Sequence, residues 1–275
     1  MAEPAQTPVE QGLPAVRFYG DAAGYDTFMG VWSKALAPLF LRFAAPARLA
    51  SMLDLGCGTG NLLAAAADRF PGARLVGIDP STALLAQARS RLERKGVELI
   101  GGACEELPFA DATFDGCLSL LVLQEFADRA GALREMRRVT RPGGIVAACQ
   151  WDFPRMPVIA ALVEALTAIG PGGQGRTLRS PIPFGDEAEL AQAWIEAEHR
   201  DVVAARIEVT RRYRDFEDLW LSLLGGSTPS TLMLAGLPED EREDVRRAMQ
   251  SRFPAAARQT RIEIVAQALV VRGRA

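Results

Sequence analysis

A carboxylate followed by a run of glycines in the first third of the sequence has the residue types and spacing of a nucleotide-binding corner. Asp54 stands in the apolar stretch 51–55, and Gly56, Gly58 and Gly60 follow it directly. Glycine lets a backbone turn sharply and lets a ligand approach where a Cβ would obstruct it. The stretch therefore predicts a short buried strand, a Gly-x-Gly-x-Gly turn and a helix beginning near residue 61, which together bind nucleotides in α/β sheets.

A second carboxylate, Asp79, ends the next predicted strand, about 20 residues past the glycines. It can accept hydrogen bonds from both hydroxyls of a ribose, whether the ligand is NAD or another adenosine derivative. Asp54 narrows the choice, because a carboxylate before the turn repels a pyrophosphate but suits an ammonium group and a sulfonium charge. Asn61 also stands where the dinucleotide pattern has Gly. These residues favour S-adenosylmethionine, and an NAD-dependent oxidoreductase is the alternative.

The composition narrows the class of protein further. The net charge of −3 gives no reason to expect nucleic-acid binding, and no apolar run reaches the roughly 18 residues of a membrane span. The four cysteines include no Cys-x-x-Cys pair and His199 is the only histidine, so we expect no metal site. We expect a cytoplasmic protein with buried thiols and a surface histidine.

Strands and helices alternate after the glycine turn, which predicts a Rossmann-like, doubly wound sheet of the α/β class. The predicted strands are 52–55, 74–78, 97–101, 114–122, 145–151, 201–213 and 260–272, and the predicted helices are 62–69, 82–95, 131–140, 158–169, 186–198, 216–224 and 239–253. We expect Asn61 and Ser81 to cap the first two of these helices, and Gly96 to end the second.

Before the glycine turn, apolar residues recur at three- and four-residue spacing between Tyr25 and Phe43, which is typical of an amphipathic helix. Pro38 interrupts the pattern, so we expect a kink or two short helices with Pro38 in the first turn of the second. This part either covers the sheet alone or also closes over a ligand with Tyr25, Met29 and Trp32.

The domain organisation follows from these elements. We expect a disordered tail over 1–14, an N-terminal helical cap over 15–50, and a core over 51–214 and 256–275. Residues 215–255 form a helical insertion between the last two strands. Its apolar content indicates a hydrophobic ligand, a subunit interface of a homodimer, or packing on the sheet of a monomer.

Several ordered segments give the sequence a family resemblance. They are Leu53-Asp-Leu-Gly-Cys-Gly-Thr-Gly60, Gly77-Ile-Asp-Pro-Ser81, Glu105-Glu-Leu-Pro-Phe109 with Thr113-Phe-Asp115, Leu133-Arg-Glu-Met-Arg-Arg-Val-Thr-Arg-Pro-Gly-Gly144, and Tyr25-Asp-Thr-Phe-Met-Gly-Val-Trp-Ser33. With them the chain resembles the class I S-adenosylmethionine-dependent methyltransferases of the ubiquinone/menaquinone-biosynthesis-like group. The resemblance covers about residues 17–151. It implies a seven-stranded sheet that is mostly parallel, with its last strand antiparallel.

The resemblance also implies roles for individual residues. Asp54 would hold the ammonium group, Asp79 the ribose, and Pro80 would flank the adenine. The expected cofactor-binding residues are Tyr25, Asp54, Gly56, Cys57, Gly58, Asp79, Pro80, Cys104, Glu105 and Leu120. One departure is Ala103, because the family often has an Asp there that accepts a hydrogen bond from the adenine amino group. The backbone of Cys104 and the side chain of Glu105 are the expected substitutes.

The sequence indicates the methyl acceptor less clearly than it indicates the cofactor. Methyl transfer is an in-line displacement that depends mainly on positioning, and a base is needed only for a weakly acidic acceptor. The Asn-Pro-Pro-Tyr motif of some amino-group methyltransferases is absent after the fourth strand. We expect a small, apolar or aromatic acceptor, with S-adenosylhomocysteine as the other product. Candidates at the acceptor are Gln124, Glu125, Trp151 and Asp152, and a non-catalytic or repurposed cofactor-binding protein is a further alternative.

Overall fold

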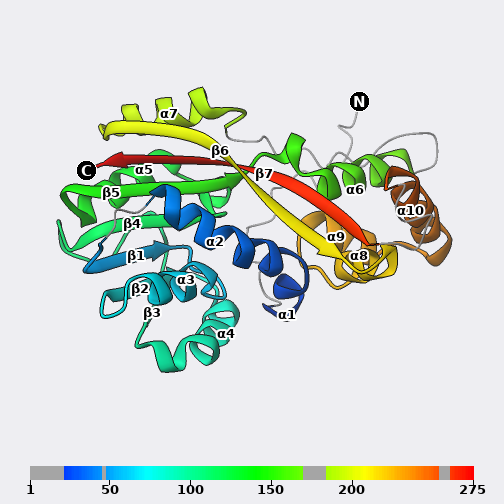
Figure 1. The fold of residues 1–275 in the computed structure, drawn as a ribbon, viewed down its shortest axis with the longest axis horizontal. Helices are drawn as coiled ribbons and strands as arrows, with labels where there is room; N and C mark the ends of the chain where they lie inside the picture. The colour runs from blue at the N-terminus through cyan, green and yellow to red at the C-terminus, as the bar shows by residue number, and fades with distance from the viewer. Residues whose placement is uncertain (1–21, 45–47, 170–183, 254–260) are drawn as a thin grey trace, which may run out of the picture.

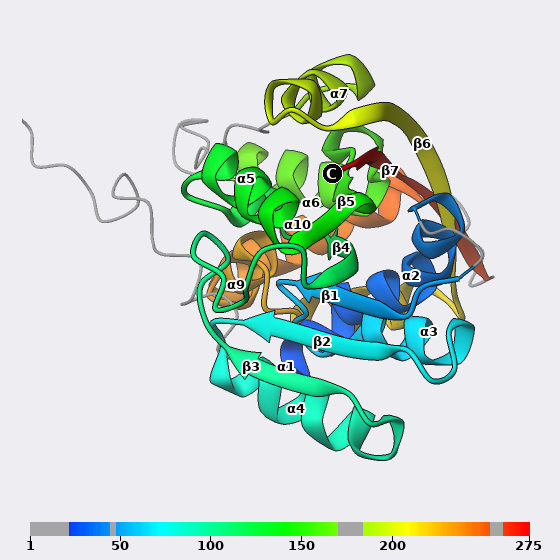
Figure 2. The ribbon, with the colours of Figure 1, turned by 90° about the vertical axis from the view of Figure 1, so that its left-hand side faces the viewer.

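Residues 22–44, 48–169, 184–253 and 261–275 are described by the computed structural model of the chain, so the predicted tail 1–14 lies outside them. Within the described residues, seven strands form one sheet in the order β3-β2-β1-β4-β5-β7-β6 (Figures 1 and 2). The strands are β1 (Ser51–Leu55), β2 (Arg74–Asp79), β3 (Glu98–Gly101), β4 (Phe114–Leu120), β5 (Thr140–Trp151), β6 (Arg200–Tyr213) and β7 (Ile262–Arg274). β7 is antiparallel to both neighbours, and the other pairings are parallel. The predicted sheet is confirmed.

Helices cover both faces of this sheet. Leu36, Leu63 and Leu85 pack α2, α3 and α4 into one core, whereas Met136 and Trp194 pack α5 and α7 into the other. The helices are α1 (Ala22–Tyr25), a π-helix (Asp26–Gly30), α2 (Val31–Ala44), α3 (Asn61–Arg69), α4 (Thr82–Leu92), α5 (Arg129–Val139), α6 (Pro157–Ala168), α7 (Glu187–Glu196), α8 (Phe216–Leu224), α9 (Pro229–Ala235) and α10 (Glu239–Arg252). Because both faces are covered, β1 is buried along its whole length.

The N-terminal part of the chain is more continuous than its sequence predicts. Pro38 lies inside the single helix α2, so of the two expected alternatives, a kink or two short helices, the two short helices are wrong. A proline within a helix costs about 3 kcal/mol, because it removes a hydrogen bond and crowds the preceding turn. The helix persists because Trp32, Leu36 and Phe40 are fully buried on its sheet-facing side, and burying each such side chain contributes about 1.5–3 kcal/mol.

The predicted insertion between the last two strands is confirmed. β6 and β7 form a long antiparallel hairpin that extends past the end of β5 to α8, α9 and α10, on the right of Figure 1. The sequence predicted two helices here and missed α9. Gly225, Gly226 and Pro229 indicated a loop, but Thr228 forms a capping box with Thr231 that starts a helix.

Local contacts also correct several boundaries. β4 ends at Leu120 rather than at residue 122, because Leu121 adopts a φ of +64° that breaks the extended backbone. Ser81 caps α4 as predicted, accepting a hydrogen bond from the Leu84 amide, and Gly96 ends the turn that follows with a φ of +65°.

The expectation of a surface histidine is wrong, since His199 is buried against Trp194 with ring centroids 6.0 Å apart.

The buried cysteines and the helix lengths complete the description. Cys57, Cys104, Cys117 and Cys149 are all buried and none forms a disulfide. Burial raises the pKa of the Cys149 thiol above its usual range, which makes it a packing residue. In the described part of the chain, no helix is both long and apolar enough to cross a membrane.

Candidate active site

Asp54 and Asp79 lie close together at the carboxyl ends of two adjacent strands. β1 and β2 are parallel neighbours, with Asp54 paired to Gly77 two residues before Asp79. Asp54 is 1% exposed, and within the described residues neither of its carboxylate oxygens has a hydrogen-bond partner. Asp79 is also buried, and its two oxygens accept hydrogen bonds from the amides of Gly58 (2.9 Å) and Ser81 (2.8 Å).

These two carboxylates put negative charge in a buried site without a neighbouring cationic side chain among the described residues. Burial raises the pKa of Asp54 well above its ordinary value, and the nearby charge of Asp79 raises it further. The pKa of Asp79 is also raised by burial, although the two amides oppose the shift. Among the described residues, no cationic side chain contributes to either shift. A ligand that brings positive charge to Asp54 would therefore relieve an unfavourable burial.

The glycine turn holds these carboxylates around an approach path for a ligand. Gly56, Gly58 and Gly60 have φ values of +71°, +52° and +81°, which favour glycine. A Cβ on Gly56 would lie 2.5 Å from the Val122 side chain, whereas one on Gly58 would have no described atom within 4 Å. Gly56 is thus required for packing, and Gly58 leaves the backbone open to a ligand.

The expected capping role of Asn61 is wrong. Gly60 takes the N-cap position of α3, and no side chain caps this helix end. Asn61 is instead the first helical residue, and its side chain donates to the Gly30 carbonyl (3.1 Å) and to the Ser33 hydroxyl (2.7 Å). The first amides of α3 consequently have no side-chain cap among the described residues.

A cavity above the glycine turn brings most of the predicted cofactor-binding residues together. Its volume is about 20 Å³. It is lined by Tyr25, Ser33, Asp54, Gly56, Cys57, Gly58, Thr59, Asn61, Leu62 and Leu120. The sequence predicted six of these residues and missed Ser33, Thr59, Asn61 and Leu62, which belong to no recognised motif. Burial beside the carboxylates raises the pKa of Tyr25 to about 12.

The remaining predicted cofactor residues lie around Asp79. Pro80 follows Asp79 and is exposed, whereas Cys104 is buried. Burial raises the pKa of the Cys104 thiol, and the nearby charges of Asp79 and Glu105 raise it further, which places Cys104 close to both carboxylates. The Glu105 carboxylate accepts a hydrogen bond from the Ala127 amide (3.3 Å). Ala103 is exposed, so a longer side chain fits at that position.

The acceptor candidates lie at or past the ends of β4 and β5 but in different surroundings. Gln124 and Glu125 are half-buried in the turn after β4, and the Gln124 amide donates to the Leu121 carbonyl (3.0 Å). Trp151 is 1% exposed and packs edge-on against Trp32, with ring centroids 6.0 Å apart. Asp152 is buried and accepts hydrogen bonds from two arginines, so its charge is used inside the fold.

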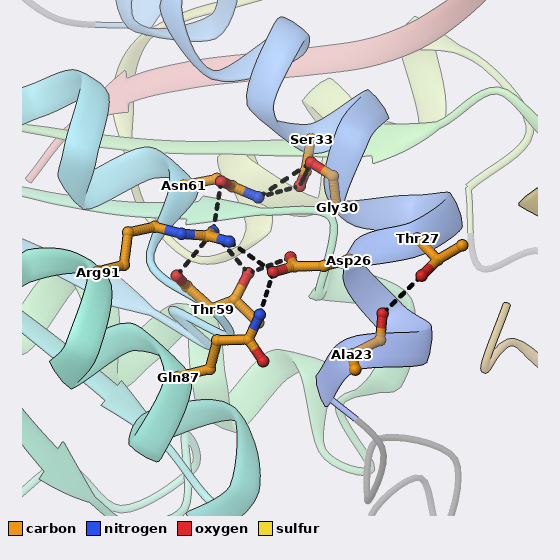
Figure 3. A network of polar contacts seen from close by, with 9 residues as sticks. All are labelled: Ala23, Asp26, Thr27, Gly30, Ser33, Thr59, Asn61, Gln87 and Arg91. Carbon is orange, nitrogen blue, oxygen red and sulfur yellow. Dashed lines mark hydrogen bonds and ion pairs between the residues drawn. The ribbon is translucent and has the colours of Figure 1, made fainter. Parts of the chain in front are cut away.

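A polar network that the sequence did not reveal joins the N-terminal segment, defined as residues 22–33, to the glycine turn and to α4 (Figure 3). Asp26 accepts hydrogen bonds from the side chains of Thr59, Gln87 and Arg91. Arg91 also donates to the Asn61 side chain (2.8 Å). The partners of Asp26 are 33 to 65 residues away in the sequence, so no local motif could indicate the network.

The fold and the site define a Rossmann-like protein with an acidic, glycine-lined ligand corner, and comparisons with known proteins identify its family. Residues 53–148 match the family model described as a methyltransferase domain. The chain is 32% identical over 196 residues to demethylmenaquinone methyltransferase of Roseiflexus castenholzii, covering 66% of this chain and 82% of that protein. The chain therefore belongs to the class I S-adenosylmethionine-dependent methyltransferases and is an enzyme of this class.

Two further proteins show how broad this similarity is. The malonyl-[acyl-carrier protein] O-methyltransferase of Geobacter sulfurreducens is 33% identical over 179 residues, covering 64% of this chain and 67% of that protein. Among solved structures, phosphoethanolamine N-methyltransferase 2 of Haemonchus contortus with bound S-adenosylhomocysteine has a TM-score of 0.52 and 19% identity. That match covers 88% of this chain and 52% of the other, and it shows the shared fold.

The glycine geometry predicts unequal losses of stability. Gly143→Ala and Gly58→Ala introduce a left-handed alanine into open space, so each should lower the free energy of unfolding by about 1–2 kcal/mol. Gly56→Ala should cost clearly more, because its Cβ also displaces Val122. Chemical denaturation of the three variants measures the difference, and equal losses would contradict the assigned packing role of Gly56.

The buried charge of Asp54 predicts a pH-dependent stability. Because its pKa is raised in the fold, the wild type without ligand loses stability as pH rises from about 4 through that raised pKa. Asp54→Asn lacks this loss and should be more stable at pH 7 by about 1–3 kcal/mol. The gain should shrink toward zero near pH 4. Calorimetric unfolding from pH 4 to 8 tests this, with the exposed Asp111→Asn as control, and equal midpoints at pH 7 would refute it.

Proposed function

We propose that this enzyme binds S-adenosylmethionine across the carboxyl ends of β1 and β2 and transfers its methyl group to a small molecule. The observation that carries the proposal is the Asp54 carboxylate, buried without a partner among the described residues. Its negative charge fits the ammonium group of this cofactor and tolerates the sulfonium nearby. The open space at Gly58 fits the same ligand, because no described side chain fills it.

The other site residues have matching roles in this proposal. Each Asp79 oxygen accepts one amide hydrogen bond and keeps a lone pair for a ribose hydroxyl. Exposed Pro80 would flank the adenine, with the Cys104 backbone and Glu105 at its edge. The backbone from Gly56 to Gly58 would face the methionine part, with Tyr25 and Leu120 closing the cavity around it.

The chemistry requires little beyond positioning. When bound, S-adenosylmethionine supplies a methyl group that its sulfonium already makes electrophilic, with S-adenosylhomocysteine as the leaving product. The protein excludes water and holds an acceptor in line with the carbon–sulfur bond. Gln124 is suited to orient an acceptor, because its buried Oε1 has no partner within the described structure. Glu125 is the candidate base for an acceptor that must lose a proton.

We propose a small acceptor with an apolar or aromatic part. The apolar side chains of the insertion that are most buried, including Leu219 and Leu223, pack into the core. Leu120 at the end of β4 lines the cavity, and Trp151 at the end of β5 is buried against Trp32. One relative is named for demethylmenaquinone and another for malonyl-[acyl-carrier protein], so the names of the relatives differ in acceptor.

The proposal is tested first by binding. Calorimetric titration of the wild type should show binding of S-adenosylmethionine and S-adenosylhomocysteine and none of NAD. Asp79→Ala should weaken both by tenfold or more, because two charge-assisted hydrogen bonds to the ribose are lost. Asp111→Ala removes the same charge from an exposed position and should leave affinity unchanged. Binding of NAD alone would overturn the proposal, and an unchanged affinity in Asp79→Ala would refute the role of that residue.

Transfer itself needs a separate measurement. Incubation of the wild type and S-adenosylmethionine with a panel of phenols, quinones and carboxylic acids should yield S-adenosylhomocysteine and a methylated acceptor, detected by mass spectrometry. A protein that binds the cofactor and methylates nothing in the panel would favour the non-catalytic alternative.

The exposed position of Ala103 gives a gain-of-function test. Ala103→Asp introduces the carboxylate that the family often has at this position, so cofactor affinity should rise by about fivefold if one hydrogen bond worth about 1 kcal/mol is gained. Ala103→Asn, which lacks the charge, is the matched control and should gain less. No gain in the Asp variant would show that Glu105 or water already binds the adenine amino group.

A further inference from the structure

The β3–β4 loop, residues 102–113, carries Cys104 and Glu105 at the proposed adenine edge and contains no helix or strand. It passes beside α5 on its way to β4 (Figure 2). Ala103 within this loop has only a methyl group, which cannot form a hydrogen bond with a ligand. Recognition of an adenine by this loop therefore depends on where the Cys104 backbone and the Glu105 carboxylate are held.

Two side chains of α5 bind the middle of this loop. Glu135 and Arg138 are about one helical turn apart and form a bidentate ion pair. The Nε atom of Arg138 donates to one carboxylate oxygen of Glu135 and its Nη2 atom to the other, both at 2.7 Å. The same pair binds both backbone groups of Leu107, because its amide donates to Glu135 (2.9 Å) and its carbonyl accepts from Arg138 (3.0 Å).

Arg138 uses its whole guanidinium group in these contacts. Its Nη1 atom donates to the Phe109 carbonyl (2.7 Å) and to the Asp111 carboxylate (2.8 Å). Together with the bonds to Glu135 and Leu107, all N–H groups of the guanidinium then have an acceptor. The hydrogen bond from Arg138 also lowers the pKa of Glu135 below its ordinary value, so the pair is charged at neutral pH.

The hydrogen bonds of the loop nearer to the cofactor corner are longer. The Gly102 amide donates to the Asp79 carbonyl at 3.3 Å, and the Glu105 carboxylate accepts from the Ala127 amide at 3.3 Å. Leu107 is two residues past Glu105, and its side chain is buried while both of its backbone groups are bound. The pair on α5 therefore holds the adenine side of the loop from its far end.

We propose that Glu135 and Arg138 are positioning residues that hold the β3–β4 loop where it recognises the amino edge of the adenine. The proposal rests on the proposed function. Neither residue lines the cavity above the glycine turn. They act on the adenine only through the loop backbone, and they thereby determine the preference of the site for adenine over a purine that lacks the amino group.

The test compares two ligands that differ at this edge, since S-inosylhomocysteine has an oxygen where S-adenosylhomocysteine has the amino group. In calorimetric titration, the wild type should bind S-adenosylhomocysteine about fivefold more tightly or better, as one hydrogen bond predicts. Arg138→Gln should weaken S-adenosylhomocysteine by about fivefold and should barely change S-inosylhomocysteine, because the displaced loop no longer reads the amino group. The preference should fall to about twofold or less.

Further variants separate positioning from a merely structural contact, which would weaken both ligands by one factor and leave the preference unchanged. Glu135→Gln should lower the preference as well, and the double variant with Arg138→Gln should add little, because both break the same ion pair. Arg138→Lys keeps the charge without the planar set of donors, so it should also lose the preference. Arg137→Gln breaks the neighbouring surface pair with Glu198 and should change neither affinity. The midpoint of unfolding shows which variants are folded.

The outcomes distinguish the role of this pair from the cofactor assignment. If the wild type binds both ligands equally well, or if the folded Arg138 variants keep a preference above about twofold, the positioning role is refuted and the proposed function stands. If the wild type binds neither S-adenosylmethionine nor S-adenosylhomocysteine, the proposed function and the positioning role both fail.

Discussion

The arrangement depends on a carboxylate placed where its charge is unfavourable. Asp54 is held at the end of a buried strand beside Asp79, and the part of the chain that the structure describes supplies no cation to it. Such a burial is costly in the folded chain and becomes favourable only when a positively charged partner arrives. Enzymes commonly lose stability at their binding sites in this way, because the same groups that bind a ligand are badly placed without it.

Two parts of the fold hold that site, the central strands and the N-terminal segment. β1 and β2 are central strands covered on both faces, and Asp79 ties the glycine turn to β2 through the Gly58 amide. The opposite wall belongs to the N-terminal segment, whose Phe28 and Trp32 are buried in the core and whose Ser33 accepts a buried hydrogen bond from the Asn61 amide. The site is therefore held on both sides by side chains that are packed into the core.

The sequence predicted the sheet well because its signals are local. Apolar runs ended by glycine or by acidic residues mark the strands, and Ser81 and Gly96 mark the two ends of a helix. Its errors came from residues whose conformation is set by distant contacts. Leu121 turns left-handed at the end of β4, where its amide binds the Cys149 carbonyl, and α2 continues through Pro38 because its buried face packs on the sheet.

By itself, the sequence determined the fold class, the family and the positions of Asp54, the glycine turn and Asp79, because each is encoded in a few neighbouring residues. Tertiary structure alone decided that Asn61 binds the N-terminal segment instead of capping α3, and that Asp26 meets Arg91 from 65 residues away. Such pairs leave no periodic or adjacent pattern in one chain. They exist only because folding brings α4, the glycine turn and the π-helix together, as Figure 3 shows.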